Sequence, residues 1–278
     1  MKLSEVLRKG EALLQNEDAK LEAWILFSEV FGLDRGRYFL QMQREANETA
    51  ADAYFEMVHR RQSGEPVAYI IGNWEFMGLP FQVSPAVLIP RPDTETLVEA
   101  VIEWVQKKKI KPAVLDLCTG SGCIAISIAK YLQCSGVDAV DISPEAIAVA
   151  QENAKLNHVS VGFWQGDLWE VLPAGRQYDV IVSNPPYIDW SQLKELEHDV
   201  IDYEPKLALD GGEDGLVFYR RLAERTCEFL NAGGRAFWEI GYDQGKTAAE
   251  IAKSFGLNVI EVRKDLAGHD RVVIMEKE

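Results

Sequence analysis

The spacing of hydrophobic positions changes twice along the chain. Over about the first 62 residues these positions recur at helical intervals, which predicts a small bundle of short helices. Between Pro66 and Pro92, β-forming residues mix with glycines, which predicts a hairpin or a bridging pair of strands over residues 69–81. From residue 112 onward, short aliphatic runs alternate with helical patterns, as in α/β proteins.

One predicted helix of the N-terminal region has recognisable ends. Asp18 is a plausible N-cap and Gly32 a plausible stop. Leu21, Trp24, Ile25 and Ser28 share one face of this helix, which is expected to pack inward. Leu26, Val30 and Phe31 widen its apolar surface. A second helix is expected to follow Asn47, to run to Arg61 and to end at Gly64.

The alternating region predicts a doubly wound, mainly parallel sheet with helices on both faces, because strands and helices follow one another in turn. Strands are expected at 113–117, 136–141, 161–165, 178–183, 234–240, 258–262 and 271–275, and helices at 124–132, 144–157, 216–230 and 245–255. The last two strands have no helix between them, so the last strand should run antiparallel.

These patterns predict three parts: a helical domain at 1–64, a hairpin linker at 65–92 and a Rossmann-like domain at 93–278. Residues 189–214 form the longest stretch without clear periodicity, which indicates a lid or a substrate loop.

Composition narrows the class of partner. The chain has 29 Lys and Arg residues and 44 Asp and Glu residues, so its formal net charge is 29 − 44 = −15. Duplex nucleic-acid binders usually carry a basic stripe instead. No apolar run approaches the length of a membrane span, and the first residues lack the apolar core of a signal peptide, so a cytoplasmic protein without a membrane partner is expected. The four cysteines and four histidines show no metal-ligand spacing, which predicts reduced cysteines and no metal.

The most informative motif is Asn184-Pro185-Pro186-Tyr187, which follows the aliphatic run of a predicted strand. Two consecutive prolines cannot donate ladder hydrogen bonds, so the strand must end there. A rigid turn then presents an amide and an aromatic ring at the carboxyl end of a strand, where open α/β sheets bind ligands. An amide acceptor, fixed carbonyls and an aromatic face suit the binding of a planar NH2 group.

A glycine-containing loop joins the first strand of the sheet to its helix: Asp116-Leu117-Cys118-Thr119-Gly120-Ser121-Gly122. Such a loop brings backbone close to a ligand at a helix N-terminus, although a tight turn without a ligand is an alternative. Asp141 ends the next strand, where a carboxylate can bind both ribose hydroxyls. The loop lacks the G-x-G-x-x-G spacing that holds a pyrophosphate. Asp116 would repel a pyrophosphate but could accept from an ammonium group, so S-adenosylmethionine fits better than a dinucleotide.

Gly166-Asp167-Leu168-Trp169 follows the third strand of the sheet. Asp167 is placed to accept from the adenine amino group, and Leu168 or Trp169 to pack against the adenine ring. The alternative for Trp169 is an ordinary core aromatic.

Together these segments resemble class I methyltransferases that act on planar nitrogen. Four further segments resemble the protein-(glutamine-N5) methyltransferases of bacterial peptide chain release factors, the PrmC (HemK) family: residues 66–72, 88–95, 204–209 and 265–271. The resemblance covers nearly the whole chain, including the helical N-terminal domain. Asn-Pro-Pro-Tyr alone is less specific, because adenine-N6 DNA methyltransferases share it.

The resemblance implies that the substrate is the glutamine of the Gly-Gly-Gln motif in class 1 release factors. It also implies that Cys118 to Gly122, Asp141, Trp169 and Asn184 contact the cofactor, and that Asn184 to Tyr187 hold the glutamine. The general methyltransferase pattern has glycine where this chain has Cys118, and cysteine resists a positive φ.

Two other functions remain as alternatives. An adenine-N6 nucleic-acid methyltransferase would use the same four-residue motif, but it should carry a basic groove. A non-catalytic module that binds the cofactor or a translation factor would have no need of an NH2 clamp. The roles of Arg91, Asp93, Glu95, Glu204 and Glu239 stay open at this point, and the adjacent pair His269-Asp270 is not expected to form a catalytic dyad.

Overall fold

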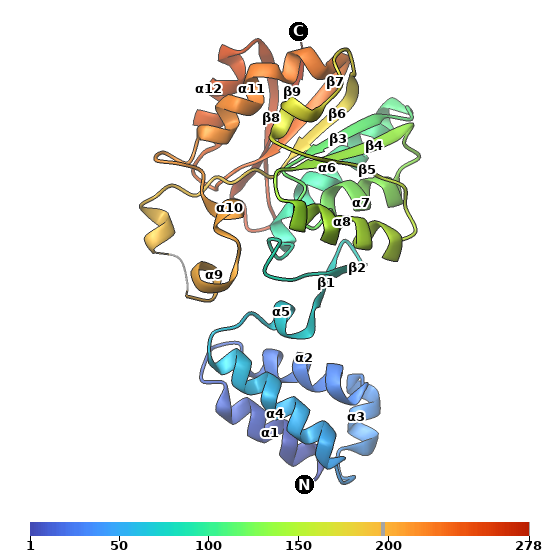
Figure 1. The fold of residues 1–278 in the computed structure, drawn as a ribbon, viewed down its shortest axis with the longest axis vertical. Coiled ribbons are helices and arrows are strands. Elements are labelled where there is room, and N and C mark those ends of the chain that lie inside the picture. The colour runs from blue at the N-terminus through green and yellow to red at the C-terminus, as the bar shows by residue number, and fades with distance from the viewer. Residues whose placement is uncertain (196–197, 278) are drawn as a thin grey trace. The chain divides into compact units, whose positions relative to one another are not determined.

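The computed structural model describes residues 1–195 and 198–277, which form two units (Figure 1). The first unit comprises Met1–Asn73 together with helix α9 (His198–Tyr203). The second unit comprises residues 74–195 and 204–277. Within the described residues, no helix has both the length and the apolar character to cross a membrane.

The first unit is a bundle of short helices around an aromatic core. Its remaining helices are α1 (Leu3–Leu13), α2 (Ala19–Phe31), α3 (Arg35–Gln41), α4 (Glu48–Gln62) and α5 (Val67–Ile71). Phe27 of α2 and Tyr54 of α4 are fully buried and meet edge to face, with their ring centroids 5.7 Å apart. The side chain of Asn47 caps α4 by accepting from the backbone N–H of Ala50 at 3.1 Å.

Two details of α2 differ from the sequence prediction. Ala23, Leu26 and Phe27 form the buried face, whereas Leu21 is 54% exposed. The large rings of the core select the face around Phe27, and the apolar pattern alone did not distinguish the two faces. Asp18 makes no side-chain capping bond, but Gly32 ends the helix in the left-handed conformation as predicted.

The bridging region is also partly helical. Residues 69–71 belong to α5 and not to a strand, because Gly72 ends a helical turn that begins after Pro66. The hairpin is shorter than predicted and consists of β1 (Asn73–Phe76) and β2 (Leu79–Gln82). The Glu95 carboxylate accepts from Met77 N at 2.7 Å, so this charge has a structural role in the hairpin.

The second unit contains a seven-stranded sheet of order β5-β4-β3-β6-β7-β9-β8. The strands are β3 (Ala113–Leu117), β4 (Gly136–Asp141), β5 (Gly162–Gln165), β6 (Tyr178–Ser183), β7 (Leu230–Glu239), β8 (Leu257–Lys264) and β9 (Asp270–Lys277). Strand β9 runs antiparallel to both of its neighbours, and β3 to β7 pair in parallel. The predicted doubly wound α/β fold with an antiparallel last strand is confirmed.

Helices cover both faces of this sheet (Figure 1). They are α6 (Pro92–Lys108), α7 (Cys123–Tyr131) and α8 (Pro144–Leu156) on one face, and α11 (Val217–Phe229) and α12 (Gly245–Ser254) on the other. Alternate strand residues serve the two cores: Val182 and Phe237 face α6 and α7, whereas Ile181 and Trp238 face α11 and α12.

The stretch predicted as a lid carries short helices, η2 (Gln192–Lys194), α9 and α10 (Lys206–Leu209). Its two ends meet, because Ile188 N donates to Leu209 O at 3.1 Å and Gly211 N donates to Ile188 O at 2.9 Å. Residues 196 and 197 of the predicted loop lie outside the described residues.

Candidate active site

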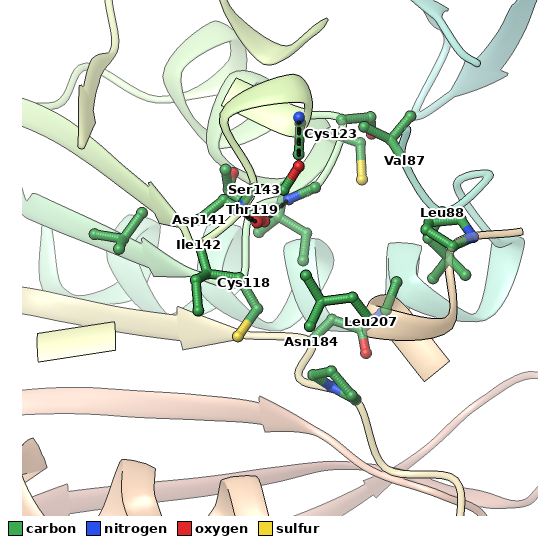
Figure 2. A pocket seen from close by; sticks show the side chains of 18 of the residues that line it. Val87, Leu88, Cys118, Thr119, Cys123, Asp141, Ile142, Ser143, Asn184 and Leu207 are labelled. Carbon is green, nitrogen blue, oxygen red and sulfur yellow. Dashed lines mark hydrogen bonds between the residues drawn. The ribbon is translucent and has the colours of Figure 1, made fainter. Parts of the chain in front are cut away.

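A cavity opens at the carboxyl ends of β3, β4 and β6, inside the second unit (Figure 2). Its lining comes from several segments: residues 86–94, the loop after β3, the turns after β4 and β5, the residues after β6, the residues around α10, and Phe218 of α11. Side chains from these segments converge on one space, among them Leu88, Thr119, Asp141, Asn184 and Leu207. This is the sheet edge at which doubly wound proteins bind ligands.

The loop after β3 is held by hydrogen bonds to its neighbours. Thr119 N donates to Val140 O at 3.0 Å, and Gly122 N donates to Thr119 O at 2.9 Å. Gly120 has φ +55, and a Cβ there would meet no other atom within 4 Å. The backbone at Gly120 is therefore open to a close ligand. Of the loop residues predicted to contact the cofactor, Thr119, Gly120 and Ser121 line the cavity, whereas Gly122 does not.

Asp141 stands at the end of β4 with both carboxylate oxygens oriented by backbone. Oδ2 accepts from Gly120 N at 2.8 Å, and Oδ1 accepts from Ser143 N at 3.0 Å. Burial raises the pKa of Asp141, and these backbone hydrogen bonds oppose that effect. Each carboxylate oxygen retains a lone pair for a ligand hydroxyl, because a carboxylate accepts about four hydrogen bonds in all.

Asp116 lies beneath the loop and does not line the cavity. It is fully buried, and its Oδ2 accepts from Thr119 Oγ1 at 2.6 Å and from Ala125 N at 3.2 Å. Burial raises its pKa to about 7. The geometry therefore makes Asp116 a support for the loop and the start of α7, and the predicted contact with a ligand ammonium does not fit this placement.

Cys118 adopts the left-handed conformation with φ +62, although it is not glycine. The backbone at this position thus requires the positive φ that a glycine would supply without strain. Burial raises the pKa of its thiol far above the ordinary value, so the group stays protonated at neutral pH. Cys118 lines the cavity as a small neutral side chain.

The three residues after Gly166 have separate roles. Asp167 and Leu168 line the cavity, and Arg221 Nη2 forms an ion pair with Asp167 Oδ1 at 2.8 Å. Trp169 does not line it. Its ring stacks on Phe229 with centroids 5.1 Å apart, and its Nε1 donates to Arg221 O at 3.0 Å. Trp169 is therefore a core aromatic in this structure, as in the alternative interpretation, and its predicted contact with adenine does not fit.

The motif after β6 is divided between the cavity and the core. Asn184 and Pro186 line the cavity, whereas Pro185 and Tyr187 do not. Tyr187 packs against the core beside α11, and its carbonyl accepts from Gln244 Nε2 at 2.9 Å. Asn184 Nδ2 donates to Thr94 Oγ1 at 3.4 Å. The structure thus brings Asn184 and Pro186 to the same cavity as the loop and Asp141.

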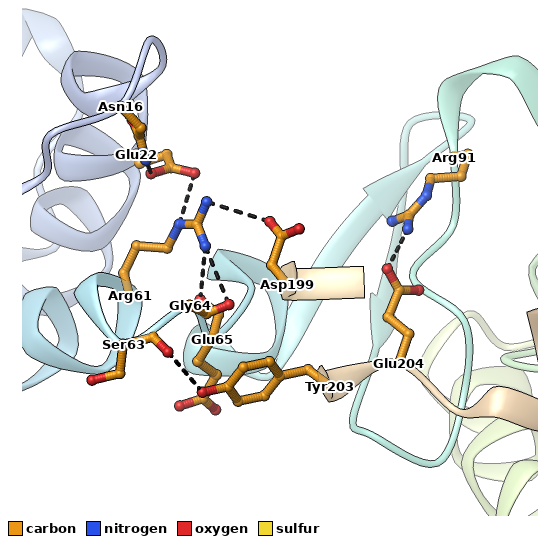
Figure 3. A network of polar contacts seen from close by, with 10 residues as sticks. All are labelled: Asn16, Glu22, Arg61, Ser63, Gly64, Glu65, Arg91, Asp199, Tyr203 and Glu204. Atoms are coloured by element: carbon orange, nitrogen blue, oxygen red, sulfur yellow. Dashed lines mark hydrogen bonds and ion pairs between the residues drawn. The ribbon is translucent and has the colours of Figure 1, made fainter. Parts of the chain in front are cut away.

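One wall of the cavity is fixed by a buried carboxylate. Glu204 is 5% exposed, forms an ion pair with Arg91 (Figure 3) and accepts from Ile89 N at 3.2 Å. Pro205, Leu207 and Ala208 follow Glu204 along the chain and line the cavity. Glu204 therefore joins the segment around Arg91 to the start of α10.

Helix α9, which precedes Glu204 in the chain, is held within the first unit (Figure 3). Arg61 forms ion pairs with Glu22 at 2.9 Å and with Asp199 of α9 at 3.5 Å. The hydroxyl of Tyr203 donates to Ser63 O at 3.1 Å. A segment without recognisable periodicity is thus anchored to the helical bundle by charge and hydrogen bonding.

Two further carboxylates, Asp93 and Asp270, form ion pairs. Asp93 pairs with Arg271 at 3.2 Å, and Arg271 also pairs with the buried Asp265 at 3.0 Å. Asp270 pairs with Lys264 at 2.8 Å. Within the described residues, no three metal-ligating side chains gather in one place.

Sequence reasoning missed several cavity residues. Thr94 and Phe218 sit on helices, and Leu207 lies in α10. A helical pattern shows which positions are apolar but not which helix end reaches the carboxyl edge of the sheet. The segments 88–95 and 204–209 resemble the family, but the resemblance assigned neither Thr94 nor Leu207 to the site.

The fold and the position of this cavity define a Rossmann-like methyltransferase. Residues 5–72 match the family model described as the PrmC N-terminal domain, and residues 93–235 match the Methyltransferase small domain. The release factor glutamine methyltransferase of Clostridium acetobutylicum is 42% identical over 99% of this chain and 98% of that protein. The protein of the same name from Geobacter sulfurreducens is 42% identical over 92% of this chain and 89% of its own length. The chain belongs to the family of release factor glutamine methyltransferases.

Solved structures share the fold at low identity. A ribosomal protein L11 methylase from Lactobacillus delbrueckii subsp. bulgaricus has a TM-score of 0.51 at 20% identity, covering 68% of this chain and 81% of its own. A methyltransferase from Pyrococcus furiosus has a TM-score of 0.52 at 22% identity, covering 73% of this chain and 90% of its own. These similarities support the architecture of the second unit.

Proposed function

We propose that this chain transfers a methyl group from S-adenosylmethionine to the side-chain amide nitrogen (N5) of the glutamine in the Gly-Gly-Gln motif of class 1 peptide chain release factors. One observation carries the proposal: Asn184 and Pro186 line the same cavity as Gly120 and Asp141. An NH2 acceptor and a nucleoside-binding carboxylate therefore share one space. The relatives cited above are named for this activity.

The residues of the cavity fit S-adenosylmethionine. Asp141 offers free lone pairs to the two ribose hydroxyls, since its orientation is fixed by Gly120 N and Ser143 N. Ile142 and Leu168 provide apolar surface for the adenine ring, and Asp167 lies beside them as an acceptor for its amino group. The open backbone at Gly120 admits the methionine portion of the cofactor.

The acceptor amide needs help, because its nitrogen lone pair is delocalised into the carbonyl. The Asn184 side-chain oxygen accepts one N–H of the glutamine amide. We assign the other N–H to the backbone carbonyl of Pro185, which lies between the two motif residues that line the cavity. These two bonds fix the plane of the NH2 group and aim its nitrogen along the line of displacement, and positioning of this kind can lower a barrier by about 7–11 kcal/mol. They also stabilise the positive charge that develops on nitrogen in the transition state. We assign Pro186 to the rigidity of this turn and Tyr187 to its support from the core side.

The bound sulfonium supplies an electrophilic methyl carbon and leaves as the neutral thioether of S-adenosylhomocysteine. As the N–C bond forms and the C–S bond breaks, positive charge passes to the amide nitrogen. The surplus proton then leaves for water, and the methylated amide is neutral. This displacement requires no metal ion, and none enters the proposal.

The charge of the chain supports a protein substrate over duplex nucleic acid, and we assign the reaction to the cytoplasm. A net charge of −15 repels a phosphate backbone. We assign the docking of the release factor to the helical bundle, because it carries no chemistry of its own.

Labelled cofactor tests the proposal directly. The protein is incubated with methyl-labelled S-adenosylmethionine and one of three acceptors: a class 1 release factor, the same factor with Gly-Gly-Gln→Gly-Gly-Ala, or DNA. Label in the intact factor alone is expected. Label in DNA alone would identify an adenine methyltransferase, and no label in any acceptor would identify a non-catalytic binder.

A further inference from the structure

The buried carboxyl of Glu239 lies next to the acceptor motif without belonging to it. Glu239 is the last residue of β7, is 2% exposed and does not line the cavity. Strands β6 and β7 pair in parallel with Ser183 opposite Trp238. Asn184 and Glu239 are therefore the next positions along two neighbouring strands.

Alternation along the strands places both side chains on one face. Val182 and Phe237 belong to the core that faces α6, so Asn184 and Glu239, two positions further along, point to the same side. Thr94 stands in the first turn of α6 and is 2% exposed. Three polar side chains from three elements thus meet where the sheet ends.

One hydrogen bond joins two of these side chains: Asn184 Nδ2 donates to Thr94 Oγ1 at 3.4 Å. Both side chains lie close enough to the Glu239 carboxyl to lower its pKa. Within the described residues, Glu239 forms no ion pair, and its Oε2 is buried without a hydrogen-bond partner. A buried carboxylate of this kind is costly for stability, which favours a role beyond packing.

The Glu239 carboxylate can determine the orientation of the Asn184 amide. An amide has a donor end and an acceptor end, and the proposed chemistry needs the acceptor oxygen toward the cavity. The Thr94 hydroxyl cannot impose that choice, because a hydroxyl both donates and accepts. An ionised carboxylate only accepts, so it attracts the NH2 end of Asn184 and the hydroxyl hydrogen of Thr94.

We propose that Glu239 is a positioning residue that, through Thr94 and directly, holds the NH2 end of Asn184 in the core and thereby turns its oxygen toward the substrate amide. This role rests on the proposed function, because only a substrate N–H gives the Asn184 oxygen something to accept. Glu239 itself touches neither substrate nor cofactor.

The role predicts a dependence on pH. Burial raises the pKa of Glu239 to about 7, whereas Thr94 and Arg271 lower it and Asp93 raises it. Arg271 comes from β9 and Asp93 from α6, and Tyr187, Tyr219 and Cys123 are the other titratable groups that interact with Glu239. Below this pKa the protonated carboxyl becomes a donor and no longer selects one end of the Asn184 amide. The kcat for methyl transfer is therefore expected to rise as pH increases through about 7.

Two variants of the full chain test the proposal, with methyl transfer to a release factor as the assay. Glu239→Leu removes the acceptor and is expected to lower kcat at about pH 8 by at least about tenfold. Its KM for the factor and its affinity for S-adenosylmethionine, measured by calorimetry, should stay within about twofold of the wild-type values, because Asp141 and the loop after β3 are untouched. Glu239→Gln keeps one acceptor, so it is expected to restore part of kcat and to abolish the rise through about pH 7.

Asp138→Asn is the matched control, because Asp138 is also a buried carboxylate but accepts from Tyr178 at 2.8 Å, away from the cavity. It should keep both kcat and its pH profile.

Wild-type protein that does not label the factor would contradict the proposed function and this role with it. Wild-type protein that labels the factor, with both Glu239 variants equally active at every pH, would contradict this role alone. If Glu239→Leu fails to fold, the pH profile of Glu239→Gln decides: an unchanged rise through about pH 7 would overturn the proposal.

Discussion

The two sides of the cavity are built differently. On the side that we propose for the cofactor, backbone groups do the positioning: Gly120 N and Ser143 N orient Asp141, and the strand ends fix the loop. On the acceptor side, one amide side chain, Asn184, depends on side chains from other elements, Thr94 on α6 and Glu239 on β7. A backbone-built site tolerates the loss of one side chain better than a site that depends on a chain of side-chain contacts.

Because of this difference, the largest loss of methyl transfer is expected from a substitution on the acceptor side. Asn184→Ala removes one of two acceptors for the substrate NH2 and should lower the rate of methyl transfer by about 10²–10³. Affinity for S-adenosylmethionine should change by less than about threefold, because the loop and Asp141 remain. Single-turnover labelling and calorimetry measure the two quantities. Asn231→Ala is a matched control, since Asn231 donates to Asp179 at 2.8 Å, away from the cavity. Near-normal turnover of the Asn184 variant would remove the basis of the mechanism.

The second prediction concerns the support beneath the cofactor side. The folded-state pKa of Asp116, about 7, lies above its unfolded value, so the folded state binds a proton that the unfolded state releases. The resulting stabilisation is complete below about pH 4 and is lost as pH rises to about 7, an effect of about 2–4 kcal/mol. Asp116→Asn is neutral at every pH and should remove this contribution from the pH dependence of the free energy of unfolding. Denaturant titrations of both proteins at several pH values measure it, and parallel pH profiles would contradict the burial argument.

The third prediction tests Asp141, on the cofactor side. Asp141→Asn replaces an oxygen that accepts a backbone N–H by an NH2 group, so affinity for S-adenosylmethionine should fall by about tenfold or more. With saturating cofactor, kcat should recover to within about threefold, because the acceptor side is intact. Asp179→Asn serves as the control, since Asp179 also accepts a backbone N–H, from Ala113 at 2.8 Å, at the opposite end of the sheet. An equal loss of kcat in the Asp141 variant under saturation would show that the two sides are not separable.

The smallest effect is expected at Cys118. Cys118→Gly removes the strain of φ +62 but frees the unfolded chain, so the free energy of unfolding should change by less than about 1 kcal/mol. The kcat should stay within about twofold, because the buried thiol takes no part in the displacement. Cys118→Val adds β-branching at a left-handed position and should destabilise by about 1–3 kcal/mol. Thermal unfolding and labelling measure both variants, and a large loss of kcat in the glycine variant would assign chemistry to the thiol.

The sequence predicted the sheet well because its strands are short aliphatic runs bounded by turns. Three strands have the predicted bounds: Ala113–Leu117, Gly136–Asp141 and Tyr178–Ser183. The face of α2 was predicted only in part, because several apolar positions compete there and the contacts of Phe27 with Tyr38 and Tyr54 select the buried face. Residues 69–71 were assigned to a strand from their β propensity, whereas the turn between Pro66 and Gly72 makes them helical.

The two sides of the site also differed in how far the sequence predicted them. Asp141 and the glycine loop were recognisable because their positions follow from strand ends, which the sequence marks. Thr94 and Glu239 reach Asn184 only through the packing of α6 and the register of β7. No local pattern encodes such a meeting of distant segments. The direct cofactor contacts proposed for Asp116 and Trp169 failed to fit for a related reason, because burial turned both side chains toward the core.

The central claim is that the planar NH2 held by Asn184 belongs to a glutamine side chain. It is tested most directly by fragmentation mass spectrometry of a class 1 release factor after incubation with the protein and S-adenosylmethionine. The account predicts one added methyl group on the side-chain nitrogen of the Gly-Gly-Gln glutamine, and its absence with the Asn184→Ala variant. A methyl group on any other residue, or an unmodified glutamine beside methylated DNA, would contradict it.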